Sequence, residues 1–308
     1  MQKAIRAIRK YKYIYGMMLP GLLVLLLFNY LPILGNIMAF QNFEPFGRGV
    51  LGGIIHGEWV GLAHFKNFFN SPYFSRLLWN TLSINLYKLI FSFPFPIVFA
   101  ILLNELRRNS ARRVIQTVAS FPHFISWVIV TGLIVTLFTA YGPLVNDVLP
   151  KIGIDASKWL TSSNTIVPML VISTMWKSFG WGAIVYLAAI TGIDTELFEA
   201  ARIDGANRFK QIWHIMLPGM APAIIIMLLT NIGNIINADI AQFMTLVGNK
   251  AFLYEKADVI ATYVYRTSML GMKYSFAAAV DLFRAVVALV MVVGADRVAK
   301  LLGQDGIW

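Results

Sequence analysis

The sequence contains no cysteine, and only 13% of its 308 residues are charged. Without cysteine, disulfide scaffolds, thiol redox chemistry and thiolate metal sites are excluded. Soluble globular chains carry about 25% charged and about 45–50% apolar residues, whereas 58% of this chain is hydrophobic. That apolar content also excludes a disordered chain. The composition therefore predicts an integral membrane protein.

The chain also lacks the motifs of an enzyme. No segment fits G-x-x-x-x-G-K-[ST], the glycine-rich loop that cradles nucleotide phosphates. His56 and His64 share one loop without a third ligand at suitable spacing, so no metal site is expected. No nucleophile, base and orienting residue stand at a spacing typical of catalysis. The sequence therefore predicts a non-enzyme that binds no cofactor of its own.

Six apolar stretches reach the length of about 20 residues that a membrane-spanning helix needs. The first is expected to be a retained span, because it exceeds the apolar run of about 7–15 residues in a signal peptide. An all-α integral membrane fold with six transmembrane helices follows. The spans are expected at residues 14–40, 79–103, 114–140, 166–193, 215–246 and 275–295.

Lysine and arginine are unevenly shared between the two sets of connections. One set, comprising both termini and the second and fourth connections, holds fourteen of them, and the opposite set holds nine in much longer loops. Because basic residues favour the cytoplasmic side, both termini are expected to be cytoplasmic. The chain then divides into a basic segment at residues 1–13, a transmembrane domain at 14–298 and a tail at 299–308. The long outer loop at 41–78 is rich in aromatic residues and glycine, and its second half is expected to form a surface helix.

The inner connection at residues 194–218 has a local organisation of its own. Asp194 is a suitable N-cap for a short amphipathic helix, and Asp204 with Gly205 is a helix stop. A second helix is expected to follow and to continue through Leu217 and Pro218. This helix-turn-helix is typical of a surface that docks a cytoplasmic partner.

The same connection carries a recognisable motif. Glu199-Ala200-Ala201, Gly205, Ile215 and Leu217-Pro218 match all seven specified positions of EAA-x3-G-x9-I-x-LP. In this the chain resembles the import permeases of ATP-binding cassette (ABC) transporters, and specifically the LplB-like branch that takes up oligosaccharides and polysaccharides. Further similarity lies in Tyr15–Gly21, in Trp59–Leu62 with Phe65, Asn67, Phe68 and Phe69, and in Leu302–Trp308.

The resemblance implies a set of partners. It implies a second homologous permease subunit, with a heterodimer favoured over a homodimer, two ATPase subunits that bind ATP and Mg, and an extracytoplasmic solute-binding protein. The location would be the bacterial inner membrane. Glu199 would contact the ATPase, Ala200 and Ala201 would allow close approach, and Gly205 would form the turn. By location alone, further candidate contacts are Glu196, Arg202, Asp204 and Arg208.

Polar residues inside the spans are candidates for a substrate path, because a charge at the membrane centre costs about 2.5–3.5 kcal/mol. Lys88 and Lys177 lie too deep to reach an interface. On a continuous fifth helix, Asn231, Asn234, Asp239 and Gln242 would form one stripe within an arc of about 140°. This stripe faces either a path or a packed interface, and both interpretations stay open. Asn237 falls off the stripe and is expected to make a packing hydrogen bond.

The aromatic residues of the spans suggest a saccharide as cargo. Trp176 is the favoured sugar contact, whereas Trp127 and Trp181 are expected to anchor the membrane interface. If Lys88 and Lys177 line the path, the saccharide would be acidic, such as alginate. The rival hypothesis is an ion-coupled secondary transporter with Asp239 or Asp281 as the coupling carboxylate. An EAA loop would have no use in such a carrier.

Overall fold

The computed structural model describes residues 10–44, 49–139, 142–153, 159–160, 162–248 and 250–301. Most of the predicted basic segment at 1–13 and of the tail at 299–308, including the matched stretch from Leu302 on, lies outside these described residues. The chain forms two compact units: one contains the residues up to Ser71 with Val264–Phe283, and the other contains Pro72–Tyr263 with the residues from Arg284 on.

The first unit begins with one long apolar span at Lys12–Phe40. It consists of α2 (Lys12–Leu25), a π-helical turn η1 (Leu26–Tyr30) and a 3-10 segment η2 (Leu31–Phe40). The outer loop then forms β1 (Gln41–Asn42), α3 (Gly49–His56), β2 (Glu58–Trp59) and α4 (Ala63–Phe69), and η8 (Arg266–Leu270) precedes the start of α16 (Tyr274–Leu301).

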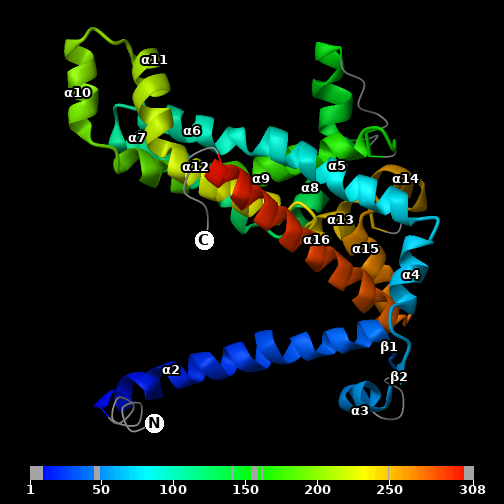
Figure 1. The fold of residues 1–308 in the computed structure, drawn as a ribbon. Helices are drawn as coiled ribbons and strands as arrows, with labels where there is room; N and C mark the ends of the chain where they lie inside the picture. The colour runs from blue at the N-terminus through cyan, green and yellow to red at the C-terminus, as the bar shows by residue number, and fades with distance from the viewer. Residues whose placement is uncertain are drawn as a thin grey trace. The chain divides into compact units, whose positions relative to one another are not determined.

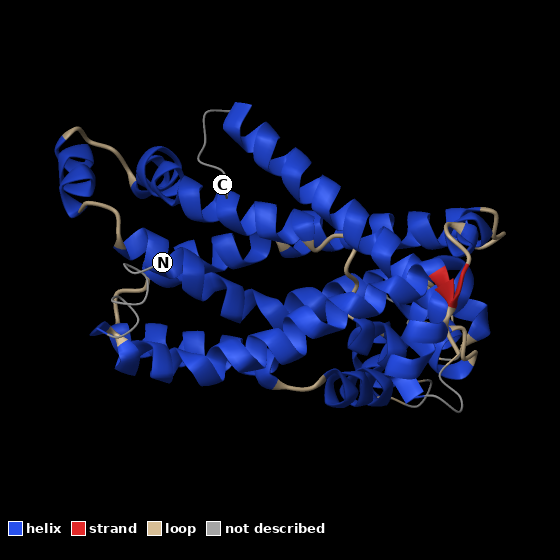
Figure 2. Cartoon of the chain, turned by 60° about the horizontal axis from the view of Figure 1, so that its bottom comes forward, coloured by secondary structure: helices blue, strands red, loops and turns tan. Residues whose placement is uncertain are grey.

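The predicted surface helix in the second half of the outer loop corresponds to α4. Phe68 of α4 is buried and packs against Phe276 and Phe283, with ring centroids 6.2 and 5.7 Å away. The two strands, absent from the all-α prediction, pair antiparallel with Gln41 opposite Trp59. Figure 2 shows them as the exception in a helical chain.

The second unit is a helical bundle in which α9 (Ile166–Thr191) is central (Figure 1). One apolar cluster joins α9 to α5 (Phe74–Ser92) and α13 (Ile240–Leu246), and a second joins it to α6 (Pro94–Asn104) and α12 (Leu217–Gly233). The remaining elements are α7 (Asn109–Ser120), η3 (Phe121–Phe124), α8 (Trp127–Phe138), η4 (Leu144–Val148), η5 (Pro150–Ile152), α10 (Thr195–Ile203), α11 (Arg208–Gln211), η6 (Ile212–Met216), η7 (Ala251–Leu253), α14 (Tyr254–Ala257), α15 (Ile260–Tyr265) and the second part of α16.

Four helical segments are long and apolar enough to cross a membrane: Lys12–Phe40, Phe74–Asn104, Arg208–Gly233 and Tyr274–Leu301. Two bent pairs raise the number to as many as six. One pair is Asn109–Phe124 with Trp127–Phe138, bent by 99°, and the other is Ile166–Thr191 with Thr195–Ile203, bent by 70°. The predicted spans at 14–40, 79–103, 166–193 and 275–295 each fall on apolar helix.

Two of the predicted spans are broken. The third is broken between Phe124 and Trp127. Its α-helix ends at Ser120 and passes into the 3-10 turn η3, in which Pro122 offers no backbone N–H. Ser126 then caps a new helix by accepting from the Ile129 N–H at 3.4 Å. The fifth ends at Gly233, and its predicted second half is the separate helix α13. Asp239 caps α13 by accepting from the Ala241 N–H at 3.1 Å. The short side chain of aspartate bonds nearby backbone N–H groups and so competes with the hydrogen bonds of a continuing helix.

The helix before the break is held against α9 by close backbone contact. A Cβ atom built on Gly180 of α9 would lie 2.1 Å from the carbonyl oxygen of Ala119 in α7. Such an approach needs glycine, as small-residue contacts between membrane helices generally do.

We therefore expect Gly180→Ala to lower the stability of the protein by about 1–3 kcal/mol, because a backbone atom cannot yield as a side chain can. The midpoint of thermal unfolding in detergent measures the loss. Gly132→Ala in α8 is the matched control, since nothing lies within 4 Å of the position that its added Cβ would occupy. Equal midpoints for the two variants would contradict the close contact.

Candidate functional site

A cavity of about 320 Å³ lies inside the second unit. It is lined by residues of α5, α6, α8, α9, α12 and the segment between α12 and α13. Its walls combine hydrogen-bonding side chains with aromatic rings, the chemistry that holds a sugar. The polar lining residues are Asn85, Lys88, Ser92, Thr174, Ser178, Asn231, Asn234, Asn237 and Asp239, and the aromatic ones include Trp127 and Tyr186.

Lys88 is the cationic group of this cavity. Its Nζ donates a hydrogen bond to Oε1 of Gln242 at 2.6 Å and lies 4.8 Å from the ring centre of Phe243. Gln242 is completely buried, and its Nε2 donates to the Leu170 carbonyl at 2.8 Å and to the Ser173 hydroxyl at 2.9 Å. Since the amide that orients Lys88 is neutral, this bond does not neutralise the positive charge of Lys88.

The carboxylate of Asp239 stands at the start of α13 on the cavity wall. Its Oδ1 caps the helix, and its Oδ2 accepts a hydrogen bond from the indole Nε1 of Trp127. Trp127 is the first residue of α8 after the break, and this bond fixes its ring beside the cavity. The prediction that Trp127 is an interface anchor is therefore wrong.

Three asparagines complete the polar wall. Asn231 and Asn234, at the end of α12, donate their Nδ2 atoms to the carbonyls of Met227 at 2.7 Å and Thr230 at 3.0 Å. Asn237 also lines the cavity, although a continuous helix placed it away from the others. The prediction of one stripe on a continuous helix is thus wrong, because α12 ends at Gly233 and α13 begins after Asp239. The cavity residues lie on α12, on the segment that follows it and at the start of α13: Asn231, Asn234, Asn237 and Asp239.

Three predicted path residues lie outside the cavity lining. Gln242 is one of them, because it is buried behind Lys88 and binds its ammonium. The other two are Lys177 and Trp176. Lys177 turns its Nζ to three backbone carbonyls at the helix break, those of Pro122 at 3.3 Å, His123 at 2.6 Å and Ile125 at 2.7 Å. It satisfies acceptors that the interrupted helix leaves open. Trp176 points to the surface of the bundle, where 41% of its area is exposed. Lys88 thus lines the cavity and Lys177 binds backbone carbonyls, and the roles of both lysines toward substrate stay predictions.

The predicted docking element is formed by α10 and the helix that follows it. Asp194 caps α10 by accepting from the Glu196 N–H at 3.0 Å, as expected from the sequence. The helix ends at Ile203, and Asp204 is its C-cap. Gly205 adopts φ +74° in the left-handed region, and the Ala206 N–H reaches back to the Ala201 carbonyl at 2.8 Å.

The second helix starts at once and carries the chain back into the bundle. Asn207 caps it by accepting from the Lys210 N–H at 2.9 Å, and the helix continues from Arg208 to Gly233 through the π turn η6. Figure 1 shows α10 and α11 side by side at one end of this unit. Ile203, Phe209 and Trp213 are 87%, 72% and 61% exposed, so this element presents apolar surface outward.

A second cavity, of about 440 Å³, lies between this element and the bundle. Glu199 and Arg202 of α10 are among its lining residues, while Glu196 and Asp204 lie exposed on the element. Arg208 reaches across to Glu105, with Nε 3.8 Å from Oε2. The predicted partner contact Arg208 therefore binds within the chain, and the connection after α6 lies beside the docking element.

The sequence and fold have well-defined relatives. Residues 92–305 match the family described as binding-protein-dependent transport system inner membrane component. The polygalacturonan/rhamnogalacturonan transport system permease protein YteP of Bacillus subtilis (strain 168) is 40% identical over 96% of this chain and 90% of that protein. Protein LplB of the same organism is 38% identical over 98% of this chain and 93% of its own length.

Solved structures resemble the fold over almost its whole length. A chain of a bacterial ABC transporter involved in the import of the acidic polysaccharide alginate superposes with a TM-score of 0.86 at 37% identity, covering 97% of this chain and 98% of that chain. A bacterial alginate ABC transporter in complex with an alginate pentasaccharide-bound periplasmic protein gives 0.87 at 36% identity, covering 98% and 99%.

The chain therefore belongs to the family of binding-protein-dependent transport system inner membrane components. Within that family it is a multi-pass permease of the bacterial inner membrane, similar to permeases of carbohydrate importers. The resemblance read from the EAA motif is confirmed, and an ABC permease is favoured over an ion-coupled carrier.

Proposed function

We propose that this chain is a transmembrane subunit of an ATP-driven importer and that it moves an acidic oligosaccharide, such as an alginate fragment, by alternating access. The cavity with Lys88 on its wall is the observation that carries the choice of cargo. It offers one ammonium whose hydrogen-bond acceptor is a neutral amide, together with asparagine and hydroxyl groups, and this set suits the carboxylate and hydroxyl groups of a uronic acid sugar. The one carboxylate of the cavity lining, that of Asp239, already accepts hydrogen bonds from Trp127 and from the start of α13. The relatives that handle alginate and polygalacturonan support this cargo.

ATP hydrolysis in this proposal takes place on two partner ATPase subunits, which bind ATP and Mg. The element α10–α11 fits a groove on such a subunit, because Leu197, Ile203 and Phe209 expose apolar surface on a rigidly capped scaffold. A second, different permease subunit and a solute-binding protein complete the assembly. The structural relative bound to a periplasmic protein supports the latter partner.

The proposed topology has six spans with both termini in the cytoplasm. Each bent pair contributes one span to this count: α7 with α8 forms the third span, and α9 forms the fourth. Two connections predicted to be cytoplasmic, the one after α6 and the one before α12, are joined by the Glu105–Arg208 ion pair. Their shared side of the bundle supports the orientation read from the basic residues.

The test of the coupling surface is copurification in detergent. The double variant Glu199→Ala with Ala200→Trp is expected to lose the ATPase subunit, because bulk on α10 blocks close approach to a groove. Ser110→Trp is the matched control, since it adds the same bulk to the exposed start of α7 in the other inner connection. Retention of the ATPase by the double variant, or no ATPase on the intact chain, would overturn the coupling role.

A further inference from the structure

A third hollow of the bundle has no part in the proposed transport path. It is a groove of about 760 Å³ on the other side of α5, between α5 and α9, with α14 at one end. Its polar lining residues are Arg76, Asn80, Ser83, Asn164, Glu255 and Lys256. The rest of its wall is apolar and includes Trp79, Tyr87, Phe91, Val171, Ile172 and Met175.

The apolar wall has the length of one lipid tail. The lining positions on α5 extend from Trp79 to Phe91, which is about 18 Å of helix at 1.5 Å per residue. Half of a hydrocarbon core of about 30 Å is about 15 Å. Trp79 is 72% exposed at the polar end of this wall, the position at which tryptophan marks a membrane interface. The groove therefore covers the depth of one leaflet.

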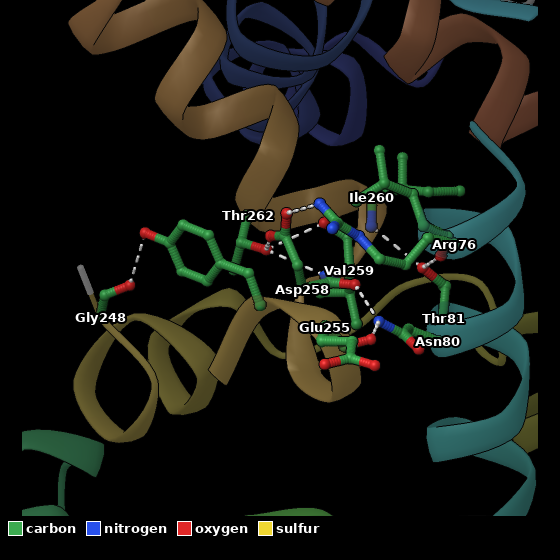
Figure 3. Close-up of polar contacts among 11 residues, drawn as sticks. Arg76, Asn80, Thr81, Gly248, Glu255, Asp258, Val259, Ile260 and Thr262 are labelled. Atoms are coloured by element: carbon green, nitrogen blue, oxygen red, sulfur yellow. Dashed lines mark hydrogen bonds and ion pairs between the residues drawn. The ribbon is translucent and has the colours of Figure 1, made fainter. Parts of the chain in front are cut away.

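The polar end of the groove is built by rigid contacts between α5 and α14–α15, as Figure 3 shows. The Asn80 Nδ2 donates to the carbonyls of Glu255 at 3.1 Å and Asp258 at 3.0 Å, and Thr81 accepts from the Ile260 N–H at 3.0 Å. These bonds hold α14 on α5. The side chains of Glu255 and Lys256 are exposed there and both line the groove.

The charges at this end are mixed. Arg76 lies with Nη2 4.0 Å from Oδ2 of the buried Asp258, and 35% of the Arg76 side-chain area is exposed. Lys256 adds a second cation and Glu255 a carboxylate. A ligand that matches this set carries a phosphate for the two cations and an ammonium group for Glu255.

We propose that the groove binds one phospholipid whose headgroup contains a phosphate and a primary ammonium, as in phosphatidylethanolamine. One acyl chain lies along the wall from Trp79 to Phe91. The phosphate binds Arg76 and Lys256, and the ammonium donates to Glu255. If α10 is cytoplasmic, as proposed above, the lipid belongs to the outer leaflet, because α14 and the start of α5 lie at the opposite end of this unit (Figure 1).

The test counts lipids on the intact detergent-purified importer by native mass spectrometry. Phosphatidylethanolamine, phosphatidylcholine and phosphatidylglycerol with identical acyl chains are added in turn. We expect one phosphatidylethanolamine per chain, retained about fivefold better than the other two, a factor typical of one exposed charged hydrogen bond. Phosphatidylcholine has no ammonium hydrogen to donate, and phosphatidylglycerol has no cation.

Two variants test the headgroup contact and the acyl-chain contact separately. Glu255→Gln is expected to remove the preference for phosphatidylethanolamine over phosphatidylcholine while the complex stays intact, since the side chain is exposed. Ile172→Trp fills the groove and is expected to lower retention of all three lipids. Leu289→Trp on α16, which adds the same bulk at another exposed position, is the control and should change nothing.

Equal retention of the three lipids by the unaltered importer, or an unchanged preference in Glu255→Gln, would overturn the proposal. So would occupation of the groove by the second permease subunit. Because the chain has no native cysteine, Tyr87→Cys supplies a single site in the groove for a short crosslinker. A crosslink from that site to the other permease means that a protein and not a lipid fills it.

Discussion

Replacement of Lys88 by methionine is expected to lower uptake of an acidic oligosaccharide by about tenfold or more, the effect of losing a charged hydrogen bond of roughly 1.5–3 kcal/mol. Lys88 lines the cavity, and its hydrogen-bond acceptor is the neutral Gln242. A substrate carboxylate that passes Lys88 would therefore meet a charge that its own acceptor has not neutralised. Methionine is one atom shorter and uncharged, and its thioether replaces the ammonium in the contact with the Phe243 ring.

The measurement is ATP-dependent uptake of labelled oligosaccharide into vesicles that contain the whole importer. Uptake of the acidic oligosaccharide should be lower with Lys88→Glu than with Lys88→Met, because glutamate places a negative charge next to the negative substrate. Lys88→Arg keeps the positive charge and should retain part of the uptake. Lys177→Met is the matched control. It removes the same group from a span, but Lys177 binds backbone carbonyls at the break before α8, so we expect loss of folded protein instead of a changed substrate preference.

Uptake of acidic substrate by Lys88→Met at the rate of the unaltered importer would contradict the role of Lys88. Equal sensitivity of acidic and neutral oligosaccharides of the same length would also count against it, since a charge on the wall should affect the charged substrate more. Copurification of the ATPase with each variant verifies that the assembly is intact. Those outcomes leave the coupling surface on α10 unaffected, so the two roles are tested separately.

Replacement of Gly205 by valine is expected to abolish coupled transport. Gly205 has φ +74°, and nothing lies within 4 Å of the position of an added Cβ, so the effect comes from backbone strain and not from a clash. The left-handed conformation costs an L-residue about 1–2 kcal/mol, and a β-branched residue more. The turn would open, and α10 would leave the orientation set by the Ala206–Ala201 hydrogen bond.

Gly205→Asn is the matched control, because asparagine tolerates this conformation better than other residues. We expect Gly205→Asn to retain most of the ATP-dependent uptake and the bound ATPase, and Gly205→Val to lose both at unchanged abundance in the membrane. Similar losses in the two variants would indicate that the side chain, not the backbone conformation, matters at this turn.

The docking element was predictable because its signals are local. Asp194, Asp204 and Gly205 lie at the ends of α10, and the structure places all three as caps or turn. Asn207, the N-cap of α11, was not among the predicted residues. The roles of Glu199, Ala200 and Ala201 toward an ATPase stay a prediction. Arg208 was assigned to a partner by position alone, and its ion pair with Glu105 depends on how α6 packs beside α12.

The cavity was predictable only in its chemistry. A helical wheel cannot show a helix break, so it places Asn237 away from the other polar residues. The position of Trp127 near a span end predicts an interface anchor, and the depth of Lys177 predicts a path residue, because neither signal reports how the helices pack. Local signals for the breaks were present, since Pro122 and Ser126 precede α8 and Gly233, Asn234 and Asp239 stand within the fifth apolar run. An apolar run nevertheless favours the prediction of one continuous span. In the structure, Ser126 and Asp239 instead cap new helices within these runs.

The class of protein, the apolar spans and the docking element could all be read from the amino acids, because composition and short-range backbone chemistry act within each segment. Which buried polar groups face a cavity follows from the packing of the helices alone. Lys88 and Gln242 meet from α5 and α13, and Trp127 and Asp239 meet from α8 and the start of α13. In a low-dielectric interior each polar group must find a partner. Which partner it finds depends on where the broken helices bring distant residues together.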